Sequence, residues 1–205
     1  MSDPFIYESE HNHVEKRSEL SDQLQQQLTE LQTVSGKRDQ WPQHHRFAGE
    51  AEFWMQVHRA LLGATAELPQ RCASLMLTVD DPAVRKKSLT GLSQLGGQLI
   101  HHAHTHHHVE DHHFFPVFQR AFPALNHHLE LLDGDHKILT ESLDQLELCL
   151  REVSLAKNYE DSKTAKSKCQ YSCEQLLAAS KRVDKLFSRH IADEEEICIP
   201  AILQI

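Results

Sequence analysis

The sequence contains little glycine and little proline, seven residues of each in a chain of 205. An all-β fold depends on many tight turns, so this scarcity indicates a helical protein. No apolar run approaches the roughly 18 residues that a membrane-spanning helix needs. The first twenty residues also lack the basic and then apolar pattern of a signal peptide. We therefore expect one cytoplasmic domain of ordinary composition, with an appended segment and without a membrane partner.

A basic surface is also missing, because the formal net charge is −9. Nucleic-acid-binding proteins need a stripe of lysine and arginine, so we expect no nucleic-acid partner. The five cysteines are an odd number without a disulfide-like spacing, which fits a reducing cytoplasm. Cys169 and Cys173 share a helix face and could bind a metal or form a redox pair. We expect them to be ordinary packing thiols.

What the sequence does contain is a series of segments with helical apolar periodicity. Residues 18–34 carry leucines at helical spacing and end at Gly36 and Pro42. Four longer segments follow, over about residues 47–67, 82–121, 123–153 and 164–199. The pattern predicts an N-terminal helical extension over residues 1–43 and a four-helix domain over residues 44–205.

Proline, glycine and aspartate mark the boundaries of these four segments. The first stops near Pro69 or continues for a turn or two through residues 71–77. The sequence DDP at 80–82 predicts a capped helix start with proline in the first turn. Gly96 and Gly97 predict a bend inside that second helix. The polar stretch over residues 156–163 predicts the link to the last helix.

The buried face of each long helix is interrupted by imidazole, carboxylate or both. Along each stripe the neighbouring positions are leucine, isoleucine, valine or another apolar residue. A buried carboxylate is very costly unless it is paired or coordinates a metal, and no lysine or arginine stands at this level of the stripes. A metal site satisfies all the interruptions together. The candidate ligands are His58, His106, Glu110, His136, His190 and Glu194.

An internal repeat supports this set of residues. The pattern His-Xaa3-Glu occurs at residues 106–110 and again at residues 190–194. A proline follows the glutamate six residues later in both copies, as Pro116 and Pro200. The recurrence predicts that the second and fourth long helices are equivalent halves of a duplicated unit.

The helix before each motif repeats as well. His58 and His136 are both followed by a basic residue and by leucine at the third and tenth positions after the histidine. An acidic residue also follows each motif glutamate, Asp111 in the first copy and Glu195 in the second. Two helical hairpins related by a pseudo-twofold would bring the six ligands to one level. We therefore predict an all-α fold, an antiparallel up-down-up-down four-helix bundle with an additional N-terminal helix.

The histidine-rich tract over residues 101–113 contains only one match to the repeat, His106. His102 and His113 lie on the same stripe, one and two turns away, and could support the ligands from behind or line a channel. We expect the remaining histidines to point sideways or outward and to have no dedicated role, although they could bind adventitious metal. These are His101, His104, His107, His108 and His112.

With one histidine in each first helix and His-Xaa3-Glu plus a proline in each second helix, residues 44–205 resemble the hemerythrin-like (HHE cation-binding) domain. The resemblance implies a bundle that holds two iron ions. It also implies that Glu110 and Glu194 bridge the two ions, together with an oxo or hydroxo bridge. Imidazole and carboxylate donors by themselves suit iron, and they suit zinc or manganese as well.

Two positions depart from the oxygen-carrying hemerythrins. Those proteins have a further histidine one turn before the third-helix ligand, where this chain has Leu132. They also have His-Xaa4-Asp in the last helix, where this chain has His-Xaa3-Glu ending at Glu194. Both departures favour the bacterial-type relatives with a more symmetric site. We therefore expect an exchangeable position at each iron and a reaction with oxygen or peroxide, rather than simple oxygen carriage.

Three functions are compatible with these residues. The first is a non-haem diiron protein that binds or reacts with oxygen, peroxide or nitric oxide, and an oxidoreductase if it is an enzyme. The alternative is a metal-handling protein that stores or delivers iron, zinc or nickel without turnover. The third is a structural bundle with a zinc clamp. Residues 18–34 could cap the bundle, cover the site as a lid or contact another subunit, and we expect capping.

Overall fold

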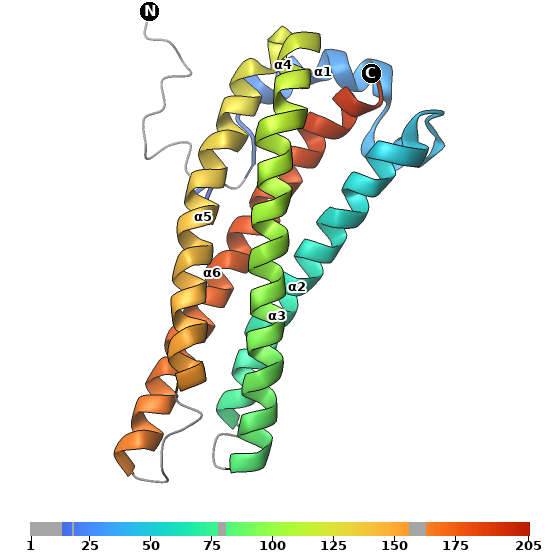
Figure 1. Cartoon of the computed structure of the whole chain (residues 1–205). Coiled ribbons are helices and arrows are strands. Elements are labelled where there is room, and N and C mark those ends of the chain that lie inside the picture. The colour runs from blue at the N-terminus through green and yellow to red at the C-terminus, as the bar shows by residue number, and fades with distance from the viewer. Residues whose placement is uncertain (1–13, 18, 78–80, 156–162) are drawn as a thin grey trace, which may run out of the picture. The chain divides into compact units, whose positions relative to one another are not determined.

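A computed structural model describes residues 14–17, 19–77, 81–155 and 163–205, which are mostly helical and contain no strand. The predicted polar link falls almost wholly on residues 156–162, and the start of the N-terminal extension falls on residues 1–13; both lie outside the described residues. The helices are α1 (Asp22–Ser35), α2 (Glu52–Leu77), α3 (Pro82–Val109), α4 (Phe115–Ala121), α5 (Asn126–Leu155) and α6 (Lys163–Ile202) (Figure 1).

The four long helices α2, α3, α5 and α6 contribute residues to two compact units. The first unit contains the chain up to Ala60, His106–Ile138 and Ser188–Ile205. The second contains Leu61–Thr105 and Leu139–Phe187. Within each unit, consecutive long helices run in opposite directions (Figure 1). The predicted all-α four-helix bundle with an additional N-terminal helix is confirmed, and all six candidate ligands belong to the first unit.

The N-terminal helix α1 packs into the core of the first unit. Leu20, Leu24 and Leu28 are buried in the same cluster as Trp41 and the last turns of α6. Burying a leucine stabilises the folded state by about 1.5–3 kcal/mol relative to leaving it exposed. His128 of α5 donates from Nε2 to the backbone oxygen of Leu24 across 3.1 Å. The leucines are therefore buried within the chain itself, as the capping prediction required.

The glycine at the end of α1 and the end of α6 hold this cap in place. Gly36 follows α1 with a φ of 77°, a left-handed conformation that glycine adopts without strain. Just before it, the hydroxyl of Ser35 donates to the backbone oxygen of Pro200 across 2.9 Å. The side-chain amide of Gln204 also donates to Ser35 Oγ across 3.0 Å. The end of α1 is thus bonded to the end of α6.

The core of the second unit explains why α2 continues through Pro69. A proline inside a helix removes one backbone hydrogen bond and costs about 3 kcal/mol. Leu68, Cys72 and Leu75 lie on one face around it and are each no more than 1% exposed. Their burial offsets the cost, and α2 runs unbroken to Leu77. Of the two predicted ends of this helix, the longer one is right.

The start of α3 matches the prediction, and the expected bend does not interrupt the helix. Asp81 Oδ1 accepts from the backbone amides of Ala83 and Val84 at 2.9 and 3.1 Å, as an N-terminal cap does. The helix passes through Gly96 without a break. A Cβ atom on Gly96 would lie 2.4 Å from Leu150 Cδ1. This glycine therefore permits a close approach of α3 to α5.

All five cysteines are buried free thiols, in agreement with a packing role. Burial raises the pKa of the Cys72 thiol to about 11. Burial and the neighbouring Cys169 raise the pKa of Cys173 to about 12. Thiols with such pKa values are protonated and unreactive near neutral pH.

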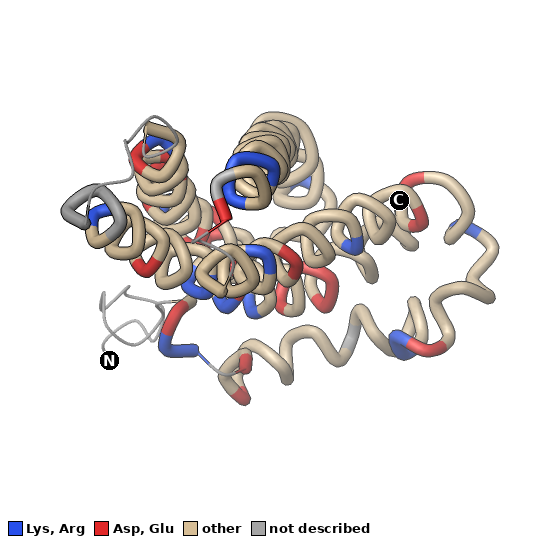
Figure 2. Tube along the Cα trace, turned by 90° about the horizontal axis from the view of Figure 1, so that it is seen from below, with Lys and Arg blue, Asp and Glu red and all other residues tan. Residues whose placement is uncertain are grey.

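The surface carries mixed charge. Acidic and basic residues are interspersed along the traced helices (Figure 2). Among the described residues, no helix combines the length and the apolar character that a membrane crossing requires.

Candidate metal centre

The second long helix changes its geometry at the candidate site. After Val109 the chain makes a π-helical turn, η3 (Glu110–Phe114), and then continues as α4. A π-helical turn contains one more residue than an α-helical turn, so it rotates the side chains that follow it. Such turns occur frequently at functional sites. Here the turn begins at the first candidate carboxylate, Glu110.

Glu110 lies between two histidines that come from different helices. Its Oε1 is 2.9 Å from Nε2 of His106 on the same chain segment. Its Oε2 is 3.4 Å from Nε2 of His136 on α5. One carboxylate thus presents a separate oxygen to each of two imidazoles.

Glu194 of α6 has the same arrangement. Its Oε1 is 3.3 Å from Nε2 of His58 on α2. Its Oε2 is 3.5 Å from Nε2 of His190 and 3.7 Å from Nε2 of His106. Both glutamates therefore lie between the same two pairs of imidazoles, one on α2 and α3 and the other on α5 and α6. All six sequence-predicted residues meet in one place.

The meeting atoms are buried and largely lack hydrogen bonds. The side chains of the six residues are between 0% and 9% exposed. Within the described residues, no hydrogen bond reaches Nε2 of the four histidines, either oxygen of Glu110 or Oε2 of Glu194. Leaving so many polar atoms unsatisfied would be costly, whereas a bound cation would satisfy all of them. The residues present therefore fit a metal site.

The potential donor atoms form two groups. Each member offers one atom, and the atoms of a group lie within 4.8 Å of one another. One group contains both glutamates with two histidines, and the other contains three histidines. The groups are His58, His106, Glu110 and Glu194, and His107, His136 and His190.

The outer nitrogen of three histidines is bonded to a carboxylate from another helix or turn. Nδ1 of His136 donates to Asp111 Oδ1 across 2.8 Å. The equivalent acid of the second copy, Glu195, accepts from Nδ1 of His58 across 3.1 Å. Because a carboxylate can only accept, Nδ1 carries a proton in both rings, and Nε2 is the nitrogen that faces the centre.

His190 is oriented in the same way, and its carboxylate is bonded to the N-terminal segment. Nδ1 of His190 lies 3.4 Å from Asp135 Oδ2. Arg17 donates from Nη1 to Asp135 Oδ1 across 3.1 Å and from Nε to Asp193 Oδ2 across 2.8 Å. The Arg17 side chain is 6% exposed and its two partners are at most 1% exposed. A buried arginine thus holds the carboxylate that orients His190.

A second arginine of the N-terminal segment, Arg38, forms an ion pair with Glu195. Glu195 accepts a hydrogen bond from His58 of α2, and Asp135, which Arg17 holds, bonds to His190 of α6. The N-terminal segment is therefore bonded to the carboxylates behind both histidines. Its polar contacts therefore complete the hydrogen bonding around the centre.

Aromatic rings line the same space. Nε1 of Trp54 donates to Glu194 Oε1 across 2.7 Å. Phe115 stacks on His136 with ring centroids 5.6 Å apart and an angle of 15° between the planes. The rings restrict the access of water, which strengthens the electrostatic interactions of the centre.

The carboxylates control the protonation of the site. Burial lowers the pKa of His106, but the adjacent Glu110 and Glu194 outweigh it and raise that pKa to about 10. For His136, Asp111 and Glu110 likewise outweigh burial and raise the pKa to about 9. Burial raises the pKa of Glu194, yet His58 and His106 hold it well below its ordinary value. Near neutral pH, the imidazoles of His106 and His136 therefore carry an additional proton, which a binding cation has to displace.

The structure contradicts the prediction that His107 points sideways or outward into solvent. Its side chain is buried, and its ring stacks on His136 with centroids 4.2 Å apart and an angle of 17°. Burial lowers the pKa of His107 well below its ordinary value, so its imidazole is neutral. The prediction failed because it assigned one stripe to each helix. Consecutive residues of an α-helix differ by 100°, so His106 and His107 reach different neighbouring helices.

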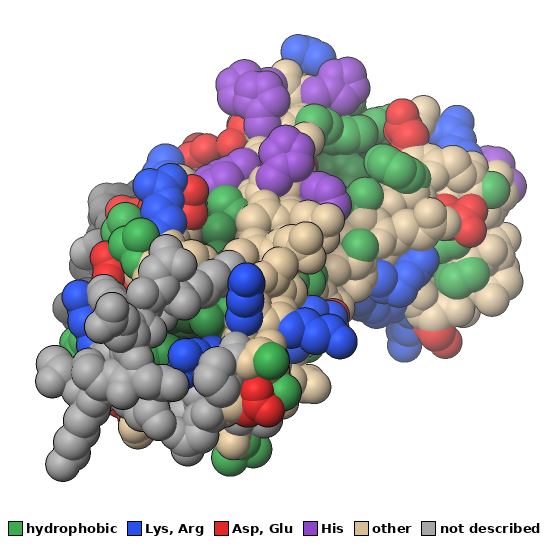
Figure 3. All heavy atoms as spheres, turned by 60° about the horizontal axis from the view of Figure 1, so that its bottom comes forward, with side chains coloured by type: hydrophobic (Ala, Val, Ile, Leu, Met, Phe, Trp, Pro, Cys, Tyr) green, Lys and Arg blue, Asp and Glu red, His purple; other side chains and the backbone are tan. Residues whose placement is uncertain are grey.

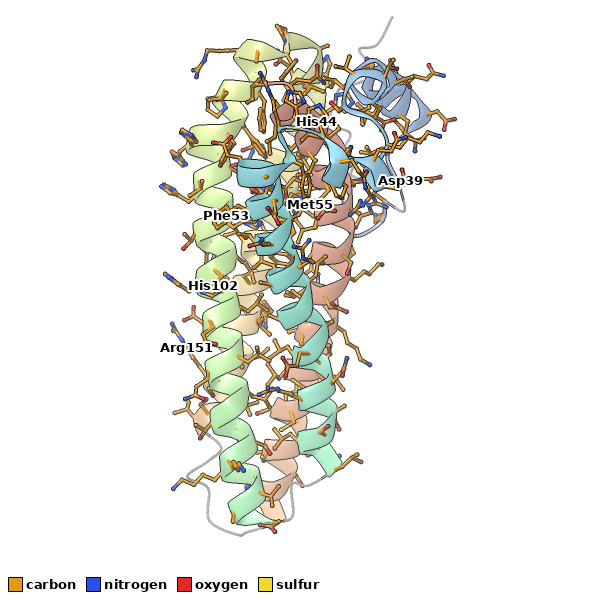
Figure 4. The ribbon with its side chains drawn as sticks, turned by 90° about the vertical axis from the view of Figure 1, so that its right-hand side faces the viewer. Asp39, His44, Phe53, Met55, His102 and Arg151 are labelled. Carbon is orange, nitrogen blue, oxygen red and sulfur yellow. The ribbon has the colours of Figure 1, made fainter. Side chains whose placement is uncertain are left out.

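The other histidines of the tract are at the surface. His102 and His113, expected to support the ligands from behind or to line a channel, are exposed, and His102 lies on the solvent side of α3 (Figure 4). Histidine side chains are visible on the molecular surface (Figure 3). His104 is partly exposed, and the remaining members, His101, His108 and His112, are exposed.

Several residues of the centre were not assigned a role from the sequence. Asp111 and Glu195 were visible as recurring acids after the motif glutamates, and this recurrence was the available signal. Asp135 directly precedes the candidate ligand His136, but the histidine that it orients is His190 of α6. Arg17 and Arg38 carried no signal, because their contacts join segments more than 100 residues apart.

A model of the hemerythrin HHE cation binding domain family matches residues 50–202. Searches of curated proteins and of solved structures returned no significant match.

Proposed function

Because the chain belongs to the hemerythrin HHE cation-binding domain family, we propose that it is a non-haem diiron protein. We further propose that it binds or reacts with oxygen, peroxide or nitric oxide. The observation that carries the proposal is the convergence of buried donor atoms without hydrogen bonds. Four imidazole Nε2 atoms and two carboxylates meet there. When bound, two iron ions would supply one-electron and two-electron redox chemistry that the side chains cannot perform.

The two glutamates support a centre for two ions rather than one. Oε1 of Glu110 and Oε1 of Glu194 lie beside His106 and His58. Oε2 of Glu110 faces His136 on the other side. A carboxylate that offers one oxygen to each side is suited to hold two cations, and its charge offsets part of theirs. A single tetrahedral zinc site would use only four donors.

The burial of the site supports a small ligand. The most exposed side chain of the six, His106, is 9% exposed. An organic substrate would need an opening to reach the donors, whereas a diatomic molecule or peroxide can enter through small fluctuations of the packing. Trp54 and Phe115 separate the donors from bulk water, which protects a reduced centre from unwanted proton transfer.

The residues around the donors position the imidazoles and hold their protons. Asp111 keeps the proton of His136 on Nδ1, and Glu195 does the same for His58. Both rings then direct Nε2 toward the centre, so Nε2 is the nitrogen that would bind a cation. Trp54 Nε1 holds Glu194 by a hydrogen bond to Oε1. The site is therefore shaped before a cation binds.

Metal analysis and absorption spectroscopy test the proposal. Protein produced with iron available should contain two irons per chain and absorb in the near-ultraviolet and visible, where zinc is silent. One zinc per chain and no recovery of iron on reconstitution would contradict the diiron assignment. The reduced protein should then change its spectrum with oxygen, peroxide or nitric oxide. If none of the three changes it, the chain handles or stores metal instead.

A further inference from the structure

We propose that His107 is a third imidazole donor beside His136 and His190, which makes the two halves of the centre unequal. This inference rests on the proposed diiron function. It goes beyond the six residues of the repeat, since the duplicated motif contains no second histidine at this position.

The placement of His107 carries the inference. Its donor atom lies within 4.8 Å of those of His136 and His190. Two nitrogens on opposite sides of one ion are about 4.2 Å apart, because metal–nitrogen distances are about 2.1 Å. Separations of at most 4.8 Å are therefore compatible with three imidazoles around one cation after a small movement of the rings. All three rings are buried, and no side chain has to leave the surface to reach the ion.

The ring of His107 lies closest to that of His136. The two centroids are 4.2 Å apart, whereas the rings of His190 and His106 are each 5.7 Å from that of His107. On the other side, the ring of His106 is 5.0 Å from that of His58. His106 and His107, which are adjacent in α3, therefore contact the histidines of α2 and α5, respectively.

The internal repeat shows that this histidine is an asymmetric addition. His106 corresponds to His190 in the second copy, so His107 corresponds to Ile191. Ile191 is 1% exposed and has no donor atom in its side chain. The duplicated site therefore has a third imidazole on one side and an aliphatic residue at the equivalent place on the other.

Counting the donors gives the functional consequence. The side of His107, His136 and His190 offers three imidazoles and the Oε2 atoms of Glu110 and Glu194, five donors in all. The opposite side offers two imidazoles and the two Oε1 atoms, four donors. The coordination position open to an external ligand would then lie on the ion beside His58 and His106. This differs from the symmetric site that Leu132 suggested.

Two variants of His107 test the inference on the full chain. His107→Ala removes the ring, and His107→Phe keeps an aromatic ring that can stack on His136 but cannot coordinate. His108→Ala is the matched control, because its side chain is the next in sequence and is exposed. Metal-free protein is titrated with ferrous iron without oxygen, and the two irons are compared by Mössbauer spectroscopy. Circular dichroism and thermal melting of the metal-free variants check that they are folded.

We expect two inequivalent irons in the unmodified protein and in His108→Ala. Both variants of His107 should bind one of the two ions at least about tenfold more weakly. At saturating iron, their two Mössbauer signals should converge. If His107→Phe binds two irons with unchanged affinity and spectrum, His107 is a packing residue and the inference is overturned, while the proposed function stands. If the unmodified protein binds no iron, both fail.

Discussion

Nδ1 of His136 donates to Oδ1 of Asp111 across 2.8 Å, which joins α5 to the π-helical turn after α3. The equivalent pairing joins His58 of α2 to Glu195 of α6, at 3.1 Å. Each acid that follows a motif glutamate therefore orients a histidine of the other copy. The duplication therefore extends to the residues behind the donors.

The first prediction follows from this equivalence. Asp111→Asn and Glu195→Gln keep the side-chain size and remove the negative charge that holds the Nδ1 proton. Each should lower the affinity for iron by about 10-fold to 100-fold, because partners of this kind tune the basicity and orientation of a ligand. Competition with a chelator measures the affinity. Asp133→Asn, whose exposed side chain pairs with Lys137, should leave it unchanged, and an equal loss in this control would argue against the assignment.

The second prediction concerns the glutamates that span the centre. Glu110→Gln and Glu194→Gln should each reduce the bound iron from two toward one or none, since a neutral amide neither offsets the charge of two cations nor offers two equivalent oxygens. Elemental analysis after reconstitution checks this. Glu196→Gln is the control on the same helix, because this side chain is only partly buried and is absent from the donor groups of the described residues. Full iron in either spanning variant would show that the carboxylates do not bind the metal.

The third prediction concerns the arginine behind His190. Arg17→Met leaves Asp135 and Asp193 buried without this cation. Removing one partner of a buried ion pair costs about 3 kcal/mol or more in the free energy of unfolding. Arg151→Met removes an exposed helix pair with Glu147 and should cost less than about 1 kcal/mol. Urea unfolding of the two metal-free variants measures these changes. Equal losses in the free energy of unfolding would contradict the inference that Arg17 holds the N-terminal segment in place.

The fourth prediction is a pH dependence of stability that arises at His128. Burial lowers the pKa of His128 below its ordinary value of 6.5 in the folded protein. Below that value the unfolded chain takes up a proton that the folded chain does not, so stability is complete above pH 6.5 and is lost as the pH falls toward the folded pKa. The contribution of His128 to the free energy of unfolding of metal-free protein should therefore decrease from about pH 7.5 to about pH 5, and the difference between the unmodified chain and a variant without this histidine measures it.

His128→Gln isolates this contribution, because glutamine does not titrate and its amide can still donate to the backbone oxygen of Leu24. As the pH falls over this range, the stability of His128→Gln should rise relative to that of the unmodified protein. Identical slopes would mean that other histidines produce the acid sensitivity.

Taken alone, the sequence determined the helical class, the duplication and the six candidate donors. This was possible because local spacing carries the information: a histidine and a glutamate four residues apart share one helix face, and a repeat places its copies at equivalent levels. The start of α3 at Asp81 and the burial of the α1 leucines follow from the same local rules. Both agree with the structure.

Only the tertiary structure decided which residues support those donors. His107 is one residue from a predicted donor, and its burial depends on α5 lying beside α3, which helical phase within α3 does not reveal. Asp111 reaches His136 from a π-helical turn that the sequence pattern did not predict. Arg17 reaches Asp193 across 176 positions of the chain. Such contacts depend on the packing of distant segments, and periodicity within one segment carries no information about them.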